Sequence, residues 1–153
     1  MSVQVSAPPE GREAIDPRGP QFTAAITAVV LLLVLVTPTG VATALIAAQA
    51  ALFALGAVSG VQHTPTAWTF RAWVRPRLSA PEELEDARPP RFAQAVGLAF
   101  SLVALGGFLA GAELVALVAT GFALVAALLN ALFRFCLGCE LYLLLRRLAP
   151  HPS

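Results

Sequence analysis

The chain has 153 residues, of which 58% are apolar and only 12% are charged. A typical soluble domain is about 25% charged, and the mean hydropathy of +0.76 excludes an ordinary water-soluble protein. The net charge of +1 gives no reason to expect nucleic acid or another polyanion as a partner. Most apolar residues fall in four blocks, so the composition predicts a small protein embedded in a lipid bilayer.

Four uncharged segments predict four membrane-spanning helices, over about residues 20–37, 41–61, 92–110 and 114–135. A helix of roughly 20 apolar residues crosses the hydrocarbon core, and only helices or closed barrels satisfy the backbone there. The segments lack the alternation that is typical of barrel strands. The expected fold class is therefore an all-α membrane protein whose four transmembrane helices form two hairpins.

The ten basic residues are all Arg, and their positions orient the hairpins. Neither short turn within a hairpin contains an Arg, whereas the N-terminal segment, the central loop and the C-terminal end contain nine of them. The positive-inside rule then predicts a multi-pass protein of the inner (plasma) membrane, with both termini and loop 62–91 in the cytoplasm. Residues 1–19, which are rich in Pro and Gly, are expected to form a flexible tail, and residues 149–153 a second tail.

The central loop, residues 62–91, begins with interleaved Trp and Arg residues. These residue types favour the headgroup layer of a membrane, so we expect a short interfacial helix there; a docking surface for a partner or nucleic acid is the alternative. Residues 79–82 then resemble a capping box, and the acidic residues around them favour a second short helix. Pro89 and Pro90 are expected to end that helix.

Glycines four residues apart occur in the second span, at Gly56 and Gly60, and in the third, at Gly107 and Gly111. Small residues at this spacing let two helices approach closely. We expect them to serve packing inside the bundle, with a homodimer contact as the alternative. Asn130 is a costly polar residue within the fourth span, and its amide is expected to bond another span.

The two cysteines, Cys136 and Cys139, come directly after the fourth span. A spacing of three on a helix puts both thiols on one face, close enough for a disulfide after modest adjustment. Gly138 between them would let the sulfur of another protein approach. Structural disulfides are disfavoured at a cytoplasmic interface, where a Cys pair is more often catalytic or metal-binding.

Three interpretations of the cysteines remain open from the residues alone. A redox or sulfur-transfer pair needs a stabilised thiolate, for which Arg134 or His63 would supply positive charge. A metal site would have only two of the four ligands that zinc prefers, so His63, a second chain or a partner would have to complete it, and we predict no metal or cofactor. Otherwise the cysteines are small apolar residues that fill space in a helix.

Residues 114–148 contain no Pro, and a helix of that length, at about 1.5 Å per residue, is longer than the hydrocarbon core. Either this helix protrudes or it bends near Gly138, and residues 136–148 form an extension beyond the membrane in both cases. In the bent form the extension lies along the inner interface, where Arg146 and Arg147 anchor its end.

Three segments resemble a known family: Asp16–Pro20 before the first span, Glu85–Gln94 before the third, and Phe135–Tyr142 at the end. They are similar to an integral-membrane family called domain of unknown function 4395, found largely in actinobacteria, and the resemblance covers roughly residues 15–148. The resemblance implies that the gene for this protein lies near genes for thioredoxin-like proteins and thiosulfate sulfurtransferases. Cys136 and Cys139 are then the natural points of exchange.

Together these features favour an inner-membrane bundle that presents a dithiol on its cytosolic face to a thioredoxin-like protein or a sulfurtransferase. One thiolate would attack a disulfide or persulfide, and the other Cys would resolve the mixed species. A non-enzymatic membrane anchor or assembly subunit, with the central loop as its docking surface, is the main alternative. A small permease for a sulfur compound is a weaker one, because few polar residues enter the spans.

Overall fold

The computed structural model describes residues 13–149. Four of its helices are long and apolar enough to cross a membrane: α1 (Arg18–Val36), α2 (Thr39–Ser59), α4 (Arg88–Leu109) and α5 (Glu113–Phe133). The expected all-α fold with four apolar helices in two hairpins is confirmed. The sequence predicts tails over residues 1–19 and 149–153. Residues 1–12 and 150–153 lie outside the described residues, whereas residues 14–15 form a short strand and α1 begins at Arg18.

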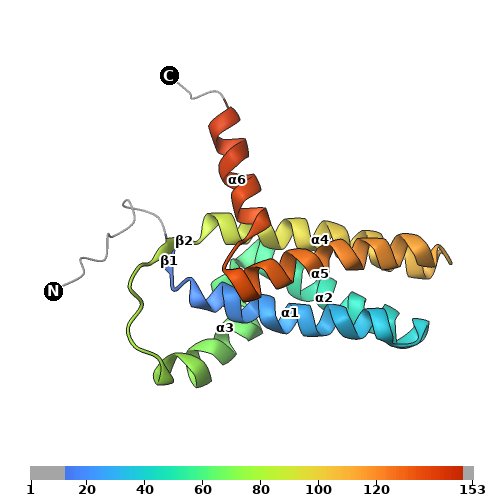
Figure 1. Ribbon diagram of the computed structural model, residues 1–153, viewed down its shortest axis with the longest axis horizontal. Helices are drawn as coiled ribbons and strands as arrows, with labels where there is room; N and C mark the ends of the chain where they lie inside the picture. The colour runs from blue at the N-terminus through green and yellow to red at the C-terminus, as the bar shows by residue number, and fades with distance from the viewer. Residues whose placement is uncertain (1–12, 150–153) are drawn as a thin grey trace.

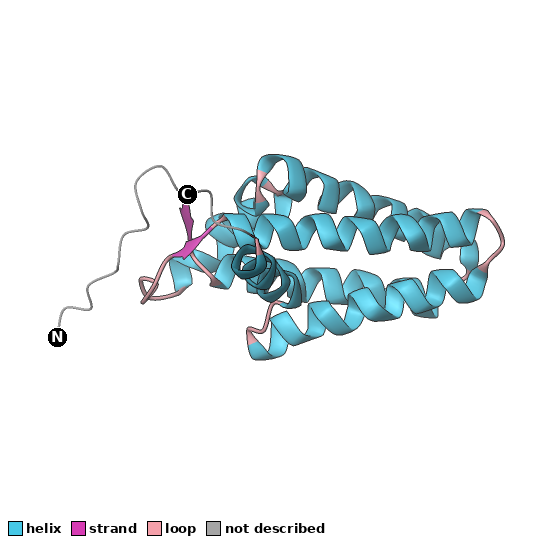
Figure 2. Cartoon of the chain, turned by 90° about the horizontal axis from the view of Figure 1, so that it is seen from above, coloured by secondary structure: helices cyan, strands magenta, loops and turns pink. Residues whose placement is uncertain are grey.

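The four long helices form a ring in which each packs against two others (Figure 1). α1 contacts α2 and α5, and α4 contacts the same two helices. Both hairpin turns lie at one end of this bundle, which we call the turn end, and the shorter elements gather at the opposite end, the strand end. Seen from above, the long helices run side by side between these two ends (Figure 2).

Small side chains form most of the helix contacts. Seven of the eleven buried residues in the main core cluster are Ala, which lets the helix backbones approach closely. Leu31 and Ile46 are the large side chains in this core with no exposed surface. Outward-facing Val36, Leu109 and Leu114 are 70%, 73% and 75% exposed, an arrangement that suits contact with lipid tails.

The glycines of the second and third spans have two different roles. A Cβ atom at Gly56 would lie 2.5 Å from a side-chain oxygen of α4, and one at Gly107 would lie 2.9 Å from the backbone nitrogen of Ala116. Gly60 and Gly111 instead end their helices with φ angles of +96° and +76°, a conformation that favours Gly. Internal packing is confirmed for Gly56 and Gly107, whereas the other two form turns.

A pair of two-residue strands closes the strand end, β1 (Ala14–Ile15) and β2 (Glu85–Asp86), which run antiparallel. The second short helix predicted after residues 79–82 is wrong. Residues 85–86 pair with β1 instead, and the carboxylate of Asp86 accepts the backbone N–H of Arg88 at 3.0 Å at the start of α4. The acidic segment therefore starts the next long helix and forms none of its own.

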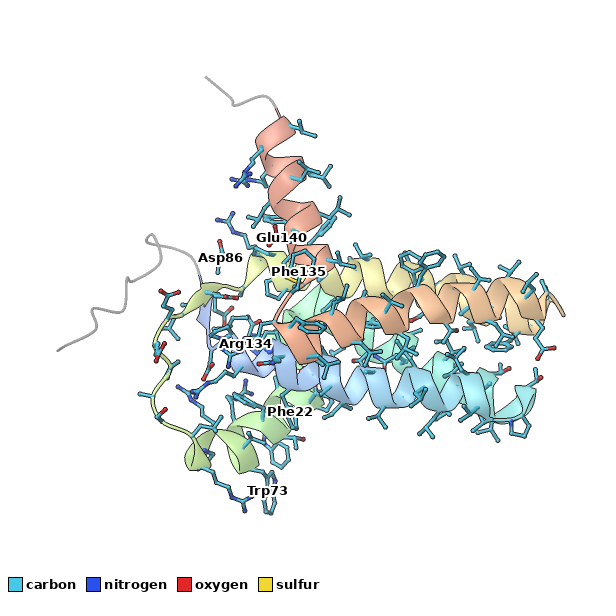
Figure 3. All side chains as sticks on the ribbon, in the orientation of Figure 1. Phe22, Trp73, Asp86, Arg134, Phe135 and Glu140 are labelled. Carbon is cyan, nitrogen blue, oxygen red and sulfur yellow. A yellow bond between two sulfur atoms is a disulfide. The ribbon has the colours of Figure 1, made fainter. Side chains whose placement is uncertain are left out.

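The first half of the central loop forms short helical segments at the strand end: η1 (Val61–His63), α3 (Pro65–Thr69), η2 (Phe70–Val74) and η3 (Arg75–Arg77). The short helix predicted there is confirmed. Phe70 is buried, and its ring centroid lies 5.8 Å from that of Phe22 in α1. Trp68 and Trp73 are each 60% exposed, and Trp73 points away from the bundle (Figure 3).

Candidate functional site

The chain breaks at Arg134, between α5 and the last helix, α6 (Leu137–Leu148). Arg134 has a φ of 56°, the left-handed conformation in which a helix commonly ends at Gly. Its N–H donates to the carbonyl of Asn130 at 3.1 Å. α6 consequently leaves the direction of the long helices and projects from the side of the bundle beyond α4 (Figures 1 and 2). The continuous helix is therefore wrong. The bent alternative agrees with the structure in kind, but the break lies at residues 134–136, before Gly138, because the α5 cap at Arg134 ends the helix there.

Cys136 lies at the N-terminus of α6 and forms a disulfide with Cys139. Their Cα atoms are 5.2 Å apart, within the usual range for this bond. Cys136 also caps the helix, because its Sγ accepts the backbone N–H of Cys139 at 3.1 Å. A sulfur at this position faces the positive end of the helix dipole, which stabilises a thiolate when the disulfide is reduced.

Gly138 holds the start of α6 against α4. A Cβ atom there would lie 2.6 Å from the Cβ of Ala93 and 2.7 Å from its Cα. One turn further, the rings of Phe92 and Tyr142 meet with centroids 5.6 Å apart. The missing side chain at position 138 therefore serves this internal contact, and the expectation that it admits the sulfur of another protein is wrong.

A cavity of about 870 Å³ opens beside the disulfide and is lined by residues of all four long helices and of α6. Thr27, Phe100 and Phe122 contribute to its wall. At about 1.5 Å per residue these three positions lie roughly 15 Å from the strand ends of their helices. The cavity thus extends from the disulfide toward the middle of the bundle.

The mouth of this cavity carries charged residues, six of them acidic and two basic: Asp16, Glu82, Glu83, Glu85, Asp86 and Glu140, with Arg18 and Arg134. Arg18 forms an ion pair of 2.8 Å with the carboxylate of Asp16, whose side chain is only 7% exposed, and donates a hydrogen bond of 2.9 Å to the Ser79 carbonyl. Burial raises the pKa of Asp16, but the hydrogen bonds from Arg18 outweigh that effect and lower it. The mouth as a whole is acidic.

Asn130 and Gln94 line the cavity from α5 and α4. Within residues 13–149 neither side chain hydrogen-bonds to another residue. The bond expected from the Asn130 amide to another span is therefore not formed. The two amides instead leave donors and acceptors available to whatever fills the cavity.

The structure brings together three of the four candidate site residues. Cys136, Cys139 and Arg134 line the same cavity, and Arg134 lies at the junction of α5 and α6 with Phe135 and Glu140 (Figure 3). His63 does not line this cavity. The imidazole Nε2 of His63 lies 3.7 Å from the carboxylate of Glu13, and both side chains are more than half exposed.

No group of three or more His, Cys, Asp or Glu residues is placed to hold a metal ion within the described part of the chain. The cavity and the place of Gln94 in it were not foreseen from the sequence, whereas Asn130 was singled out there as a polar residue within a span. Sequence reasoning also missed a repeated pattern. An Asp stands two residues before an Arg at the start of α1 and again at the start of α4. In each case the Asp carboxylate accepts the backbone N–H of that Arg at 3.0 Å. This repeat is visible in the sequence and marks the first residues of two equivalent hairpins.

Comparisons with known proteins identify the family. No curated protein and no solved structure matches the chain. A family model described as "Domain of unknown function (DUF4395)" matches residues 15–147, which is most of the chain and includes both hairpins, the cavity and the disulfide. This match confirms the resemblance noted from the sequence, and the chain belongs to that family.

Proposed function

We propose that this protein is a membrane-embedded thiol–disulfide exchange protein in which Cys136 and Cys139 cycle between a disulfide and a dithiol. Its partner is a thioredoxin-like protein or a sulfurtransferase on the cytosolic side. The observation that carries the proposal is the position of Cys136 as the N-terminal cap of α6, with the N–H of Cys139 on its sulfur.

Cys136 is the reacting sulfur in this proposal. Its contact with the helix N-terminus favours the thiolate, which is the nucleophilic form. Arg134 lines the same cavity and adds positive charge near the pair. Cys139 lies in the first turn of the same helix and acts as the resolving sulfur. His63, which lies beside Glu13, is the weaker candidate for stabilising the thiolate.

The exchange has two steps. The Cys136 thiolate attacks one sulfur of the partner's disulfide, forms a mixed disulfide and releases the partner's other sulfur as a thiolate. Cys139 then loses its proton to solvent and attacks the Cys136 sulfur, which closes the internal disulfide and releases the partner's second thiolate. The partner gains two electrons and the Cys pair loses two; the reverse steps oxidise a partner's dithiol.

With a sulfurtransferase the same sulfurs carry a sulfur atom. The Cys136 thiolate attacks the outer sulfur of the partner's persulfide, takes that atom and releases the partner's thiolate. Attack by Cys139 on the Cys136 sulfur then forms the disulfide and releases hydrosulfide.

The proposed orientation places the strand end in the cytoplasm. The distribution of Arg between the two ends supports it. The exposed Trp68 and Trp73 of the central loop and the exposed Leu residues along α6 support a strand end that rests in the headgroup layer. In that position a partner in the cytoplasm reaches the pair from the aqueous side.

Acid-quenched alkylation in cells tests the proposal. With Cys139→Ser, the mixed disulfide cannot be resolved, so we expect a partner trapped on Cys136 as an adduct that reductant releases. Cys136→Ser is the matched control and should trap much less, since Cys139 lacks the helix cap. A wild-type pair that stays fully reduced under oxidant or thiosulfate, with no adduct in either variant, would overturn the proposal.

A membrane anchor is the second candidate function, and the exposed Trp68 and Trp73 favour it, because both side chains are 60% exposed beside Arg residues of the same loop. The double variant Cys136→Ser/Cys139→Ser separates the two functions. An anchor keeps its partner binding in that variant, measured by co-purification, whereas an exchange protein loses its covalent partner.

A further inference from the structure

We propose that the cavity beside the disulfide binds a quinone, which exchanges two electrons with the Cys136–Cys139 pair. This inference rests on the proposed function, because a pair that takes electrons from a partner's dithiol must pass them to a second acceptor. The structure assigns that acceptor to the cavity, which extends from the disulfide into the membrane-spanning part of the bundle.

The size and depth of the cavity suit a lipid-soluble ring. Its volume of about 870 Å³ lies in the range of small-molecule sites, roughly 300–1,000 Å³. Phe53, Phe100 and Phe122 contribute an apolar wall toward the middle of the bundle, which suits the hydrocarbon tail of a quinone. The disulfide lies at the other end of the same space, so the ring of the same ligand can reach the reacting sulfurs.

The charges at the mouth select against an anion. Six carboxylates and two guanidinium groups line it, and a thiosulfate or another anionic sulfur compound would meet net negative charge on entering. A quinone is neutral before it accepts electrons. Because it partitions into lipid, it also enters at the depth where the spans lie.

Unpartnered polar groups in the cavity suit the two carbonyl oxygens of a quinone. Asn130 and Gln94 each have an amide N–H group without a partner among the described residues, and Arg134 lies one turn after Asn130. Carbonyl oxygens accept hydrogen bonds from such donors, and donors near the ring stabilise the negative charge that develops on reduction.

The redox step balances within the site. In the reduced state the Cys136 thiolate adds to the quinone ring, and the Cys139 thiolate then attacks the Cys136 sulfur. The sulfur–sulfur bond forms, the sulfur–ring bond breaks, and its electron pair stays on the ring. The two oxygens take up two protons, equal to those that the thiols lose, so dithiol and quinone become disulfide and quinol.

A quinone-reduction assay on the purified full-length protein tests the inference. The protein is reduced, freed of reductant and mixed without oxygen with decylubiquinone. Its fully substituted ring has no ring hydrogen to lose, so a thiolate adds reversibly and does not form a stable thioether. We expect quinol, measured by ultraviolet absorbance, to form together with the disulfide, measured by alkylation. A protein that stays reduced and forms no quinol would overturn the inference.

Two neighbouring positions on α5 provide a matched pair of variants. Ala126 lines the cavity, whereas Val125 faces outward and is 54% exposed. We expect Ala126→Phe to slow quinol formation about tenfold by filling the site, and Val125→Phe to change it less than about twofold. Equal rates in the two variants would contradict a site in this cavity.

A binding measurement without redox chemistry separates the two proposals. Cys136→Ser/Cys139→Ser should still bind decylubiquinone in equilibrium dialysis, and Asn130→Leu in that background should weaken binding about tenfold. No binding and no quinol, with partner trapping intact, would sink the quinone site and leave thiol exchange standing. Quinone reduction without any trapped partner would do the reverse.

Discussion

The two halves of the bundle, β1–α1–α2 and β2–α4–α5, have the same order of elements, but the Asp–Arg contacts at their starts differ in burial. Each has a strand, an Asp that accepts the N–H of an Arg, and a helical hairpin. Asp16 and Arg18 are mostly buried, with side chains 7% and 20% exposed, whereas those of Asp86 and Arg88 are 27% and 43% exposed. Arg18 also bonds the Ser79 carbonyl, so the first half holds the central loop against the bundle.

The halves also differ at their C-terminal ends. The first ends at Gly60, which adopts its left-handed conformation without strain and leads into the central loop. The second ends at Arg134, which adopts a left-handed conformation that disfavours side chains and leads into the disulfide. Backbone strain of this kind is often found at functional sites, and this difference between the halves agrees with the proposal that the chemistry lies at the end of the second.

The hairpin turns should differ most in stability. A Cβ atom at Gly107 would meet the backbone of Ala116, whereas one at Gly40 would meet nothing within 4 Å. We expect Gly107→Ala to cost about 1–3 kcal/mol of unfolding free energy, because backbone cannot move aside easily. Gly106→Ala, the adjacent control with open space, and Gly40→Ala should cost nothing. Denaturant unfolding in detergent, followed by circular dichroism, measures all three, and equal losses would refute the difference between the turns.

Removing the two equivalent carboxylates should give the next largest difference. Asp16→Asn disrupts a partly buried pair and a contact to the central loop, so we expect a loss of about 1–2 kcal/mol after solvent screening. Asp86→Asn should cost less, because its ion pair with Arg88 is longer and more exposed. Thermal unfolding of both variants measures the difference. A larger loss for Asp86→Asn would contradict the larger contribution assigned to Asp16.

Asp16 also predicts an acid limit to stability. Its pKa lies below the ordinary value of 3.8, because hydrogen bonds from Arg18 outweigh the effect of burial. The ionised carboxylate therefore stabilises the fold above that value, and this stability is lost as the pH falls through the lower, folded-state pKa. Thermal midpoints of the wild type should fall in this acid range, and those of Asp16→Asn should fall less.

The two left-handed helix ends should respond with opposite signs. Arg134→Gly removes backbone strain and should raise stability by about 1 kcal/mol, whereas Gly60→Ala should lower it by a similar amount. Arg134→Gly should also slow thiol exchange, and Arg134→Lys should preserve the rate by keeping the charge. Stopped-flow exchange with a small disulfide measures the rate of thiol exchange. An unchanged rate in Arg134→Gly would show that the guanidinium does not stabilise the thiolate.

Glu85 in β2 should give the smallest effect. Although the residue is exposed, it lines the cavity mouth, and partial burial of its carboxylate, followed by the charge of Glu83, raises its pKa above 4.5. The fold therefore disfavours the charged form, and stability falls as the pH rises through the folded-state pKa. Glu85→Gln should flatten this slope in thermal unfolding, and Glu83→Gln should do so less.

Hydropathy alone determined the four spans and their pairing in hairpins. Burial in lipid depends on the composition of each segment, and the short turns leave no other connection. The spacing of Cys136 and Cys139 likewise predicted that their sulfurs can meet, because residues three apart in a helical segment are neighbours. These properties are local, because each depends only on residues within one short segment of the sequence.

Only the tertiary structure decided the strand pair, the break at Arg134 and the cavity. Residues 85–86 pair with β1, which precedes the first hairpin. This contact, distant in sequence, outweighs the helix propensity of the acidic segment. The role of Gly138 depends on its close contact with Ala93 of α4, which the sequence does not reveal. The cavity depends on five helices at once, and the space between packed elements is a property of their arrangement that no single segment encodes.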